Sequence, residues 1–317
     1  MSKMNKRSIS VFVFLNLIAA AILGGCAGQS EGISDSQKSG VTAPAESEVM
    51  AALPQQEEEN AESEPVIEKA DYSEYFEGLN GAAVLYDSSE NNYQIYNQET
   101  ALTQRSPCST FKIISSLIGL ENEIIVPGDS VRPWSGEIFW NEDWNKDIEF
   151  EDAFRTSCVW YFRQVIDEIG TDLMQEELDK LQYGNRDISD WEGRLNTNED
   201  NRALTGFWIE SSLKISPKEQ TEIMERIFGI HSKYSKETQD KLKQVMLVSE
   251  QTAPGLAVYG KTGMGLEGDI VADCWFTGFA DKGERRIYFC VYLGRTDGAD
   301  VSSAKAREIA LQILTNY

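Results

Sequence analysis

The chain has 317 residues with 52 acidic and 29 basic side chains, which gives a formal net charge of −23. This charge argues against nucleic acid as a partner and against adsorption to anionic lipid or wall polymer. His231 is the only histidine, which argues against a catalytic Ser-His-Asp triad. A single histidine and widely spaced cysteines also give no cluster of metal ligands.

Residues 1–26 read as a secretory signal. Three basic residues precede an apolar run from Ile9 to Leu23, and small residues then lead to Cys26. The segment resembles a bacterial lipobox, which implies a lipid anchor at Cys26 and an extracytoplasmic, membrane-attached protein. The alternative is an uncleaved anchor helix, although the apolar run is short of the roughly 20 residues that a span needs.

Residues 27–70 are rich in Ser, Gln, Glu and Ala, with little apolar periodicity. They predict a disordered acidic tether with a reach of roughly 35–40 Å. Residues 71–317 are then long enough for one globular domain with a substantial core.

The pattern of this domain predicts strands at both ends and helices between them. Strands are expected over 82–86, 93–96, 256–262, 274–280 and 287–293, and helices over 216–228, 235–247 and 306–317. Such an order is typical of an α+β fold, with one antiparallel sheet flanked by helices and a helical lobe. The active site is expected where the lobe meets the sheet.

A candidate nucleophile and its base stand three residues apart. Ser109 and Lys112 share one helix face, and Pro107 followed by an apolar run predicts that Ser109 opens a buried helix. The positive end of the helix dipole favours a neutral lysine and a developing oxyanion.

Further motifs follow in fixed order. They are Ser157-Cys158-Val159 in an amphipathic segment, the turn Tyr183-Gly184-Asn185, the apolar Phe207-Trp208-Ile209, and Lys261-Thr262-Gly263 at the end of a strand. Ser-x-x-Lys, a second serine triad and Lys-Thr-Gly form the signature of serine enzymes that recognise penicillin.

From about Phe76 onward the chain resembles the class D, oxacillinase-type serine β-lactamases. A class A enzyme would have Ser-Asp-Asn where this chain has Ser157-Cys158-Val159. The resemblance implies hydrolysis of β-lactam antibiotics through a serine acyl-enzyme. No cofactor is implied other than carbon dioxide or bicarbonate.

The resemblance also implies a role for each motif. Ser109 would be the nucleophile, and Lys112 a carboxylated general base in a pocket formed by Phe111, Val159, Trp208 and Ile209. Trp208 would donate its indole N–H to the carbamate. The alternative for Val159, Trp208 and Ile209 is plain core packing.

Substrate contacts complete the implied site. The backbone N–H groups of Ser109 and Met264 would form the oxyanion hole, and Ser157 with Lys261 would protonate the leaving nitrogen. Thr262, beside Gly263, would bind the substrate carboxylate together with a cation. Lys305 is slightly preferred over Arg307 for that cation, and a solvent-exposed charge is the alternative for each.

Four cysteines remain after Cys26, and they allow three full pairings. Cys274 and Cys290 are symmetric about Lys282, so they could lie opposite each other in a hairpin. Cys108 and Cys158 each adjoin a motif serine, which makes their proximity plausible. The alternative is four buried, unpaired thiols.

Two other functions share these motifs. A β-lactam sensor domain would stay acylated, and a cell-wall D,D-peptidase or transpeptidase would not need Trp208 over a carbamate. The sequence leaves the substrate spectrum and the oligomeric state open.

Overall fold

The computed structural model describes residues 64–248 and 253–317. The predicted signal segment, Cys26 and the predicted tether up to residue 63 lie outside these ranges, and their predictions stay untested. None of the described helices is both long and apolar enough to cross a bilayer.

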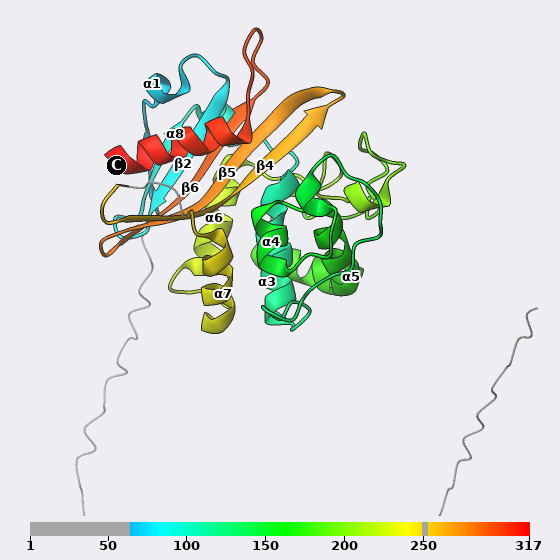
Figure 1. The fold of residues 1–317 in the computed structure, drawn as a ribbon. Coiled ribbons are helices and arrows are strands. Elements are labelled where there is room, and N and C mark those ends of the chain that lie inside the picture. The colour runs from blue at the N-terminus through cyan, green and yellow to red at the C-terminus, as the bar shows by residue number, and fades with distance from the viewer. Residues whose placement is uncertain (1–63, 249–252) are drawn as a thin grey trace, which may run out of the picture. The chain divides into compact units, whose positions relative to one another are not determined.

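A six-stranded sheet forms the centre of the described domain (Figure 1). Its spatial order is β1-β3-β2-β6-β5-β4, so strands from the two ends of the chain pair at its middle. All neighbours are antiparallel except β1 and β3. The strands are β1 Val66–Lys69, β2 Gly81–Asp87, β3 Asn92–Tyr96, β4 Leu256–Glu267, β5 Ile270–Lys282 and β6 Arg285–Gly294.

Strand β1 corrects the predicted end of the tether at residue 70. It pairs in parallel with β3, with Val66 opposite Asn92, and the flanking N–H groups of Val66 and Ala70 also donate to backbone carbonyls. All four side chains of β1 are exposed. Because the strand is held by backbone hydrogen bonds alone, it leaves no apolar pattern in the sequence.

Strand β4 is longer than predicted and places Lys261-Thr262-Gly263 in its interior rather than at its end. The strand runs on to Glu267, with a register shift between Gly265 and Leu266. Glycine is a poor strand former, so the pattern in the sequence fades where pairing with β5 continues.

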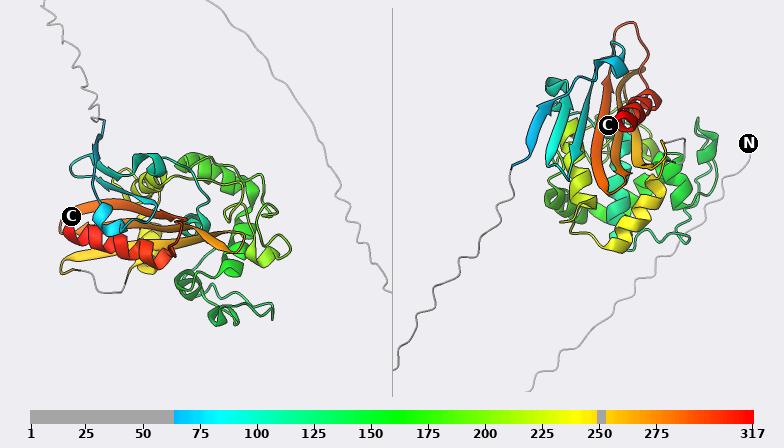
Figure 2. Two further views of the ribbon diagram at one scale, coloured as in Figure 1. Left: turned by 90° about the horizontal axis from the view of Figure 1, so that it is seen from above. Right: turned by 90° about the vertical axis from the view of Figure 1, so that its left-hand side faces the viewer.

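Helices cover both faces of the sheet (Figures 1 and 2). Helix α8 packs on β4, β5 and β6 through a cluster that includes Phe276 and Phe289, and α6 packs on the other face near Phe279 and Tyr288. The helices are α1 Ser73–Phe76, α2 Gln98–Ala101, α3 Lys112–Glu121, α4 Phe150–Arg155, α5 Val159–Leu181, α6 Pro217–Phe228, α7 Lys236–Met246 and α8 Ser303–Asn316. Three short 3₁₀ turns are η1 Cys108–Phe111, η2 Glu142–Trp144 and η3 Arg202–Leu204.

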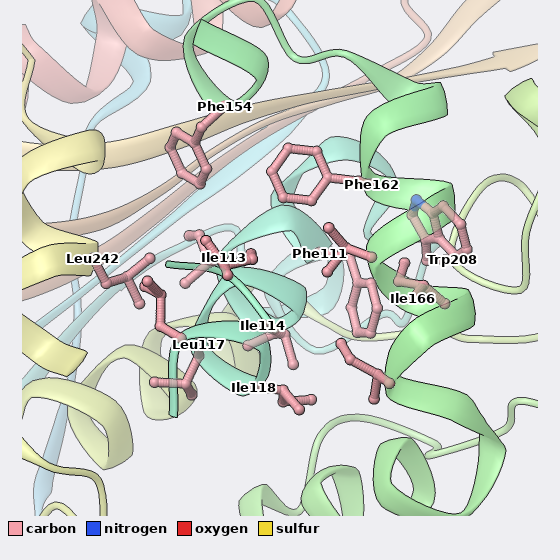
Figure 3. Close-up of a cluster of buried hydrophobic side chains, with 14 of the residues drawn as sticks. Phe111, Ile113, Ile114, Leu117, Ile118, Phe154, Phe162, Ile166, Trp208 and Leu242 are labelled. Carbon is pink, nitrogen blue, oxygen red and sulfur yellow. The ribbon is translucent and has the colours of Figure 1, made fainter. Parts of the chain in front are cut away.

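Helix α3 is the axis of the helical lobe, and every residue from Lys112 to Leu120 is buried. Figure 3 shows its isoleucine and leucine side chains between Phe162 and Ile166 of α5 and Leu242 of α7. The predicted α+β fold, with a sheet flanked by helices and a helical lobe, is confirmed. The helix predicted over residues 216–228 is α6, and the structure shows that it begins with a capping box between Ser216 and Glu219.

All four described cysteines are buried and free, so neither predicted pairing forms. In the β5–β6 hairpin Lys282 pairs with Arg285, so its centre lies beyond Lys282. Cys274 therefore faces Leu293, while Cys290 faces Thr277. The partner of Cys274, Leu293, lies an odd number of residues from Cys290 along β6. Because side chains alternate between the faces of a strand, the two thiols lie on opposite faces of the sheet.

Candidate active site

Ser109 lies in the 3₁₀ turn η1, and the α-helix begins only at Lys112. The turn is fixed at Cys108, whose φ of 49° is left-handed and whose N–H donates to the carbonyl of Trp208 at 2.9 Å. A left-handed non-glycine residue costs free energy and persists only where its surroundings impose it. The backbone beside Ser109 is thus held by a distant segment of the chain.

The side chain of Lys112 points back to the nucleophile. Its Nζ lies 2.9 Å from Ser109 Oγ and 5.5 Å from the centre of the Phe162 ring. Only 1 % of the residue is exposed. Burial lowers the pKa of Lys112 to about 8, because an ammonium loses its hydration there. Near neutral pH, Lys112 therefore gives up its proton more readily than an ordinary lysine does.

Ser157 and Lys261 form a second pair. Lys261 Nζ donates to Ser157 Oγ at 3.1 Å and to the Thr262 carbonyl at 3.1 Å. Burial, and after it the charge of Lys112, holds the pKa of Lys261 well below its usual value. The tertiary structure thus brings the two predicted Ser-Lys pairs into electrostatic contact.

The placement of Ser157 differs from the prediction of a single amphipathic segment. Ser157 has a φ of 59° and lies in the break between α4 and α5. The break turns its hydroxyl group toward β4, where Lys261 meets it.

Strand β4 lies directly against the nucleophile turn. A Cβ on Gly263 would stand 3.0 Å from the Pro107 oxygen and 3.0 Å from Thr110 Cγ2. The glycine therefore allows the backbone of β4 to approach η1. The predicted oxyanion donors, Ser109 and Met264, come from these two packed elements.

The four residues of the predicted carbamate pocket gather around α3 and the start of α5. Phe111 and Trp208 are buried and stack with ring centroids 6.1 Å apart (Figure 3). Val159 and Ile209 are partly buried. Gly206 is required beside them, since a Cβ there would lie 1.9 Å from the Trp208 ring.

The turn Tyr183-Gly184-Asn185 stands behind this pocket. Tyr183 packs edge-on against Phe111, with ring centroids 5.6 Å apart, and Gly184 approaches the Lys214 carbonyl so closely that a Cβ would be 1.9 Å from it. Asn185 Nδ2 donates to the Ser212 carbonyl. Through these contacts the turn supports the segment that follows Trp208 and contains Ser212 and Lys214.

Lys305 and Arg307 lie on α8. The ammonium of Lys305 is 3.5 Å from Glu77 and 3.3 Å from Glu308, so its described partners are carboxylates outside the two Ser-Lys pairs. The choice between the two cations as a substrate ligand stays a prediction.

Sequence reasoning missed two polar side chains that hold the site together. Gln220 of α6 is buried and donates to Thr110 Oγ1 at 2.8 Å, and Glu210 accepts from the Leu266 N–H at 2.6 Å. Gln220 shares the buried face of α6 with Ile223, and a polar residue at such a position is a recognisable signal. Glu210 has no comparable local signature.

The described geometry agrees with the chain's similarity to known proteins. The family of the penicillin binding protein transpeptidase domain matches residues 79–315. Regulatory protein BlaR1 of Bacillus licheniformis is 31% identical over 251 residues, which is 78% of this chain and 39% of that protein. The chain therefore spans about two-fifths of that relative.

Three further similarities cover most of the matched chain. Probable beta-lactamase YbxI of Bacillus subtilis (strain 168) is 31% identical over 79% of this chain and 86% of its own length. The solved C-terminal domain of the Bacillus licheniformis BlaR penicillin-receptor superposes with a TM-score of 0.68 at 29% identity, over 80% of this chain and 96% of that domain. A solved class D beta-lactamase from Bacillus subtilis superposes with a TM-score of 0.67 at 30% identity, over 78% of this chain and 95% of that chain. The chain belongs to the penicillin-binding transpeptidase family and is homologous to class D β-lactamases.

Proposed function

We propose that the chain is a serine β-lactamase that hydrolyses β-lactam antibiotics through an acyl-enzyme on Ser109. The observation that carries the proposal is the buried Lys112 amine, 2.9 Å from Ser109 Oγ. A lysine whose pKa is lowered by burial can accept the serine proton, as nucleophilic catalysis requires. The similarity to a probable β-lactamase over most of that protein's length supports the same reaction class.

In the proposed acylation, Ser109 Oγ attacks the lactam carbonyl while its proton passes to Lys112. The N–H groups of Ser109 and Met264 stabilise the oxyanion. The C–N bond then breaks, and Ser157 relays the proton: its hydroxyl group protonates the nitrogen and takes up the proton held by Lys112. Lys261, whose Nζ lies 3.1 Å from Ser157 Oγ, keeps this path polarised. Thr262, with Lys305 or Arg307, binds the substrate carboxylate.

Deacylation needs a base that can activate water, and we propose that carboxylated Lys112 is the base both for this step and for the proton transfer in acylation. The neutral amine adds carbon dioxide to give a carbamate and releases one proton. Burial of the amine near the Phe162 ring favours its neutral form, and Phe111, Val159 and Ile209 would enclose the carbamate. The Trp208 indole N–H would donate to the carbamate.

The carbamate is tested by carbon-13 spectroscopy after equilibration with labelled bicarbonate. A carbamate resonance is expected in the native protein and not in Lys112→Ala, and turnover should fall in acid and recover on adding bicarbonate. Full activity in carbon-dioxide-free buffer, with no such resonance, would leave Lys112 as a plain amine base.

A β-lactam sensor is the second candidate, because the chain is also similar to BlaR1 and to the penicillin-receptor domain. Reaction with a chromogenic cephalosporin separates the two functions. A hydrolase releases many equivalents of product per protein, whereas a sensor releases one and keeps the adduct in its intact mass. Ser109→Ala is the control and should form neither product nor adduct.

We further propose that the protein is a lipid-anchored extracytoplasmic enzyme that confers resistance. Cys26→Ser should release the protein from membranes with unchanged turnover. Retention of this variant would indicate an uncleaved anchor helix.

A further inference from the structure

Glu210 connects two walls of the active site. It follows Trp208-Ile209, the predicted cover of Lys112, and its Oε1 accepts from the Leu266 N–H at 2.6 Å. Leu266 lies on β4 immediately after the register shift and two residues beyond Met264. One hydrogen bond therefore joins the segment over Lys112 to the strand that carries Lys-Thr-Gly.

The same segment is tied to a third part of the chain. Glu210 Oε2 accepts from the Thr197 hydroxyl at 3.3 Å, and Asn196 Nδ2 donates to the Ile209 carbonyl at 3.2 Å. The position of Ile209 is thus fixed in two ways: its own carbonyl accepts from Asn196, and the side chain of the next residue, Glu210, accepts from Leu266.

Two features of Glu210 are energetically unfavourable, its backbone conformation and the burial of its carboxyl group. Its φ of 49° is in the left-handed region, which a side chain with a Cβ rarely adopts. Burial, with Asp273 as a further contribution, raises the pKa of the Glu210 carboxyl. Lys214 acts in the opposite direction, as do the hydrogen bonds from Leu266 and Thr197. Unfavourable local features that the rest of the fold holds in place, such as this backbone conformation and this buried carboxyl group, are typical of functional sites.

Glu210 contributes little apolar packing. Together with Lys214, Leu266 and Asp273 it lines a polar cavity of about 440 Å³. Without the carboxylate, water in this cavity could satisfy the Leu266 N–H. Loss of the side chain should therefore cost little stability, while it removes the constraint between Ile209 and β4.

We propose that Glu210 is a positioning residue that clamps Ile209 against β4 and so keeps the pocket around Lys112 closed. The proposal rests on the proposed hydrolysis with carboxylated Lys112. In the closed pocket the amine stays desolvated, which favours the carbamate and orders the hydrolytic water. An open pocket admits bulk water, and the carbamate is lost more readily.

The test compares Glu210→Ala with Glu210→Gln in the full chain. The amide oxygen of the glutamine can still accept from Leu266, so only the alanine removes the clamp. Glu192→Ala is the control, because it removes a carboxylate that pairs with Arg202 on the surface. The measurements are acylation and deacylation rates, the bicarbonate concentration for half-maximal turnover, and hydrogen exchange of the Leu266 amide.

Glu210→Ala should slow deacylation by about tenfold or more. It should also raise the bicarbonate requirement and speed exchange at Leu266, with acylation changed much less. Glu210→Gln should restore most of each property, and Glu192→Ala should resemble the native protein.

Unchanged deacylation and bicarbonate dependence in Glu210→Ala would overturn the clamp. Equal losses in both rates, with no rescue by the glutamine and a lower melting temperature, would also overturn it and make Glu210 a structural residue. If the native protein forms a lasting adduct without turnover, the proposed function fails. Exchange at Leu266 and the slow decay of the adduct in the variants then still test the clamp.

Discussion

Lys112 combines two properties that conflict in an ordinary core residue. It stands at the start of a fully buried helix and carries an ionisable amine. The nearest polar partner described for its Nζ is Ser109 Oγ, a neutral hydroxyl group. The free energy of keeping the amine there is a cost to folding that serves the chemistry of Ser109.

Replacing Lys112 with methionine should stabilise the fold while it abolishes turnover. The pKa of Lys112 is about 8 in the folded protein against 10.5 ordinarily, so the unfolded chain binds more protons between these pH values. In carbon-dioxide-free buffer the stability of the native protein should rise from about pH 8 to 10.5. The variant should show a smaller rise, because only Lys261 then contributes, and it should be about 1–3 kcal/mol more stable at pH 7.

Urea unfolding of both proteins at pH 7 and pH 10 measures this difference. A methionine variant that is less stable than the native protein at pH 7 would contradict the prediction. It would show that the contact with Ser109 outweighs the desolvation of the ammonium.

At the scale of elements, the site depends on how closely β4 lies against η1. Gly263 allows this approach, and Gln220 fixes the other side of the turn through its hydrogen bond to Thr110. The nucleophile turn is therefore held between a strand and a helix that are distant in sequence. Its position relative to the N–H of Met264 follows from both contacts.

Gly263→Ala should impair acylation much more than stability. The new Cβ would be 3.0 Å from the Pro107 oxygen, which forces β4 away from η1 by a few tenths of an ångström. Since the reacting groups need close alignment, acylation should slow by roughly ten- to a hundredfold. Stopped-flow labelling with a fluorescent penicillin measures the rate, and thermal melting measures stability.

A native acylation rate in the folded Gly263→Ala protein would show that β4 can move without consequence. A large loss of melting temperature would instead assign the glycine a role in folding.

At the scale of the whole molecule, strands from the two ends of the described domain pair in the middle of one sheet. Strand β2 pairs with β6, although about two hundred residues separate them, and β1 is added to the edge at β3. The helical lobe lies between these strands in sequence and rests on the sheet through α6 and α7. Such non-local pairing makes the fold sensitive to the first strands of the domain.

Two truncations test where the domain begins. A chain that starts at Glu64 keeps β1 and should retain native turnover and melting temperature. A chain that starts at Ala70 lacks β1 and exposes the edge of β3, so it should be less stable by about 1–3 kcal/mol and more prone to aggregate. Equal melting temperatures for the two chains would show that β1 contributes nothing to stability.

The sequence by itself determined the parts of the protein that depend on local pattern. Ser109 and Lys112 meet because i and i+3 side chains share a helical face, and the helix predicted over residues 216–228 corresponds to α6. The strands β2 and β3 follow from two short runs rich in apolar and aromatic residues on either side of a polar turn. The ordered motifs, together with the resemblance that they carry, identified the family.

Only the tertiary structure decided what joins distant segments. Lys261 meets Ser157 because a break between α4 and α5 turns the serine toward β4. Cys274 and Cys290 lie on opposite faces because hairpin register depends on the geometry of the turn. Strand β1 and the contact of Glu210 with Leu266 rest on backbone groups. Every residue carries such backbone groups, so the side-chain pattern of the sequence does not predict which of them will pair.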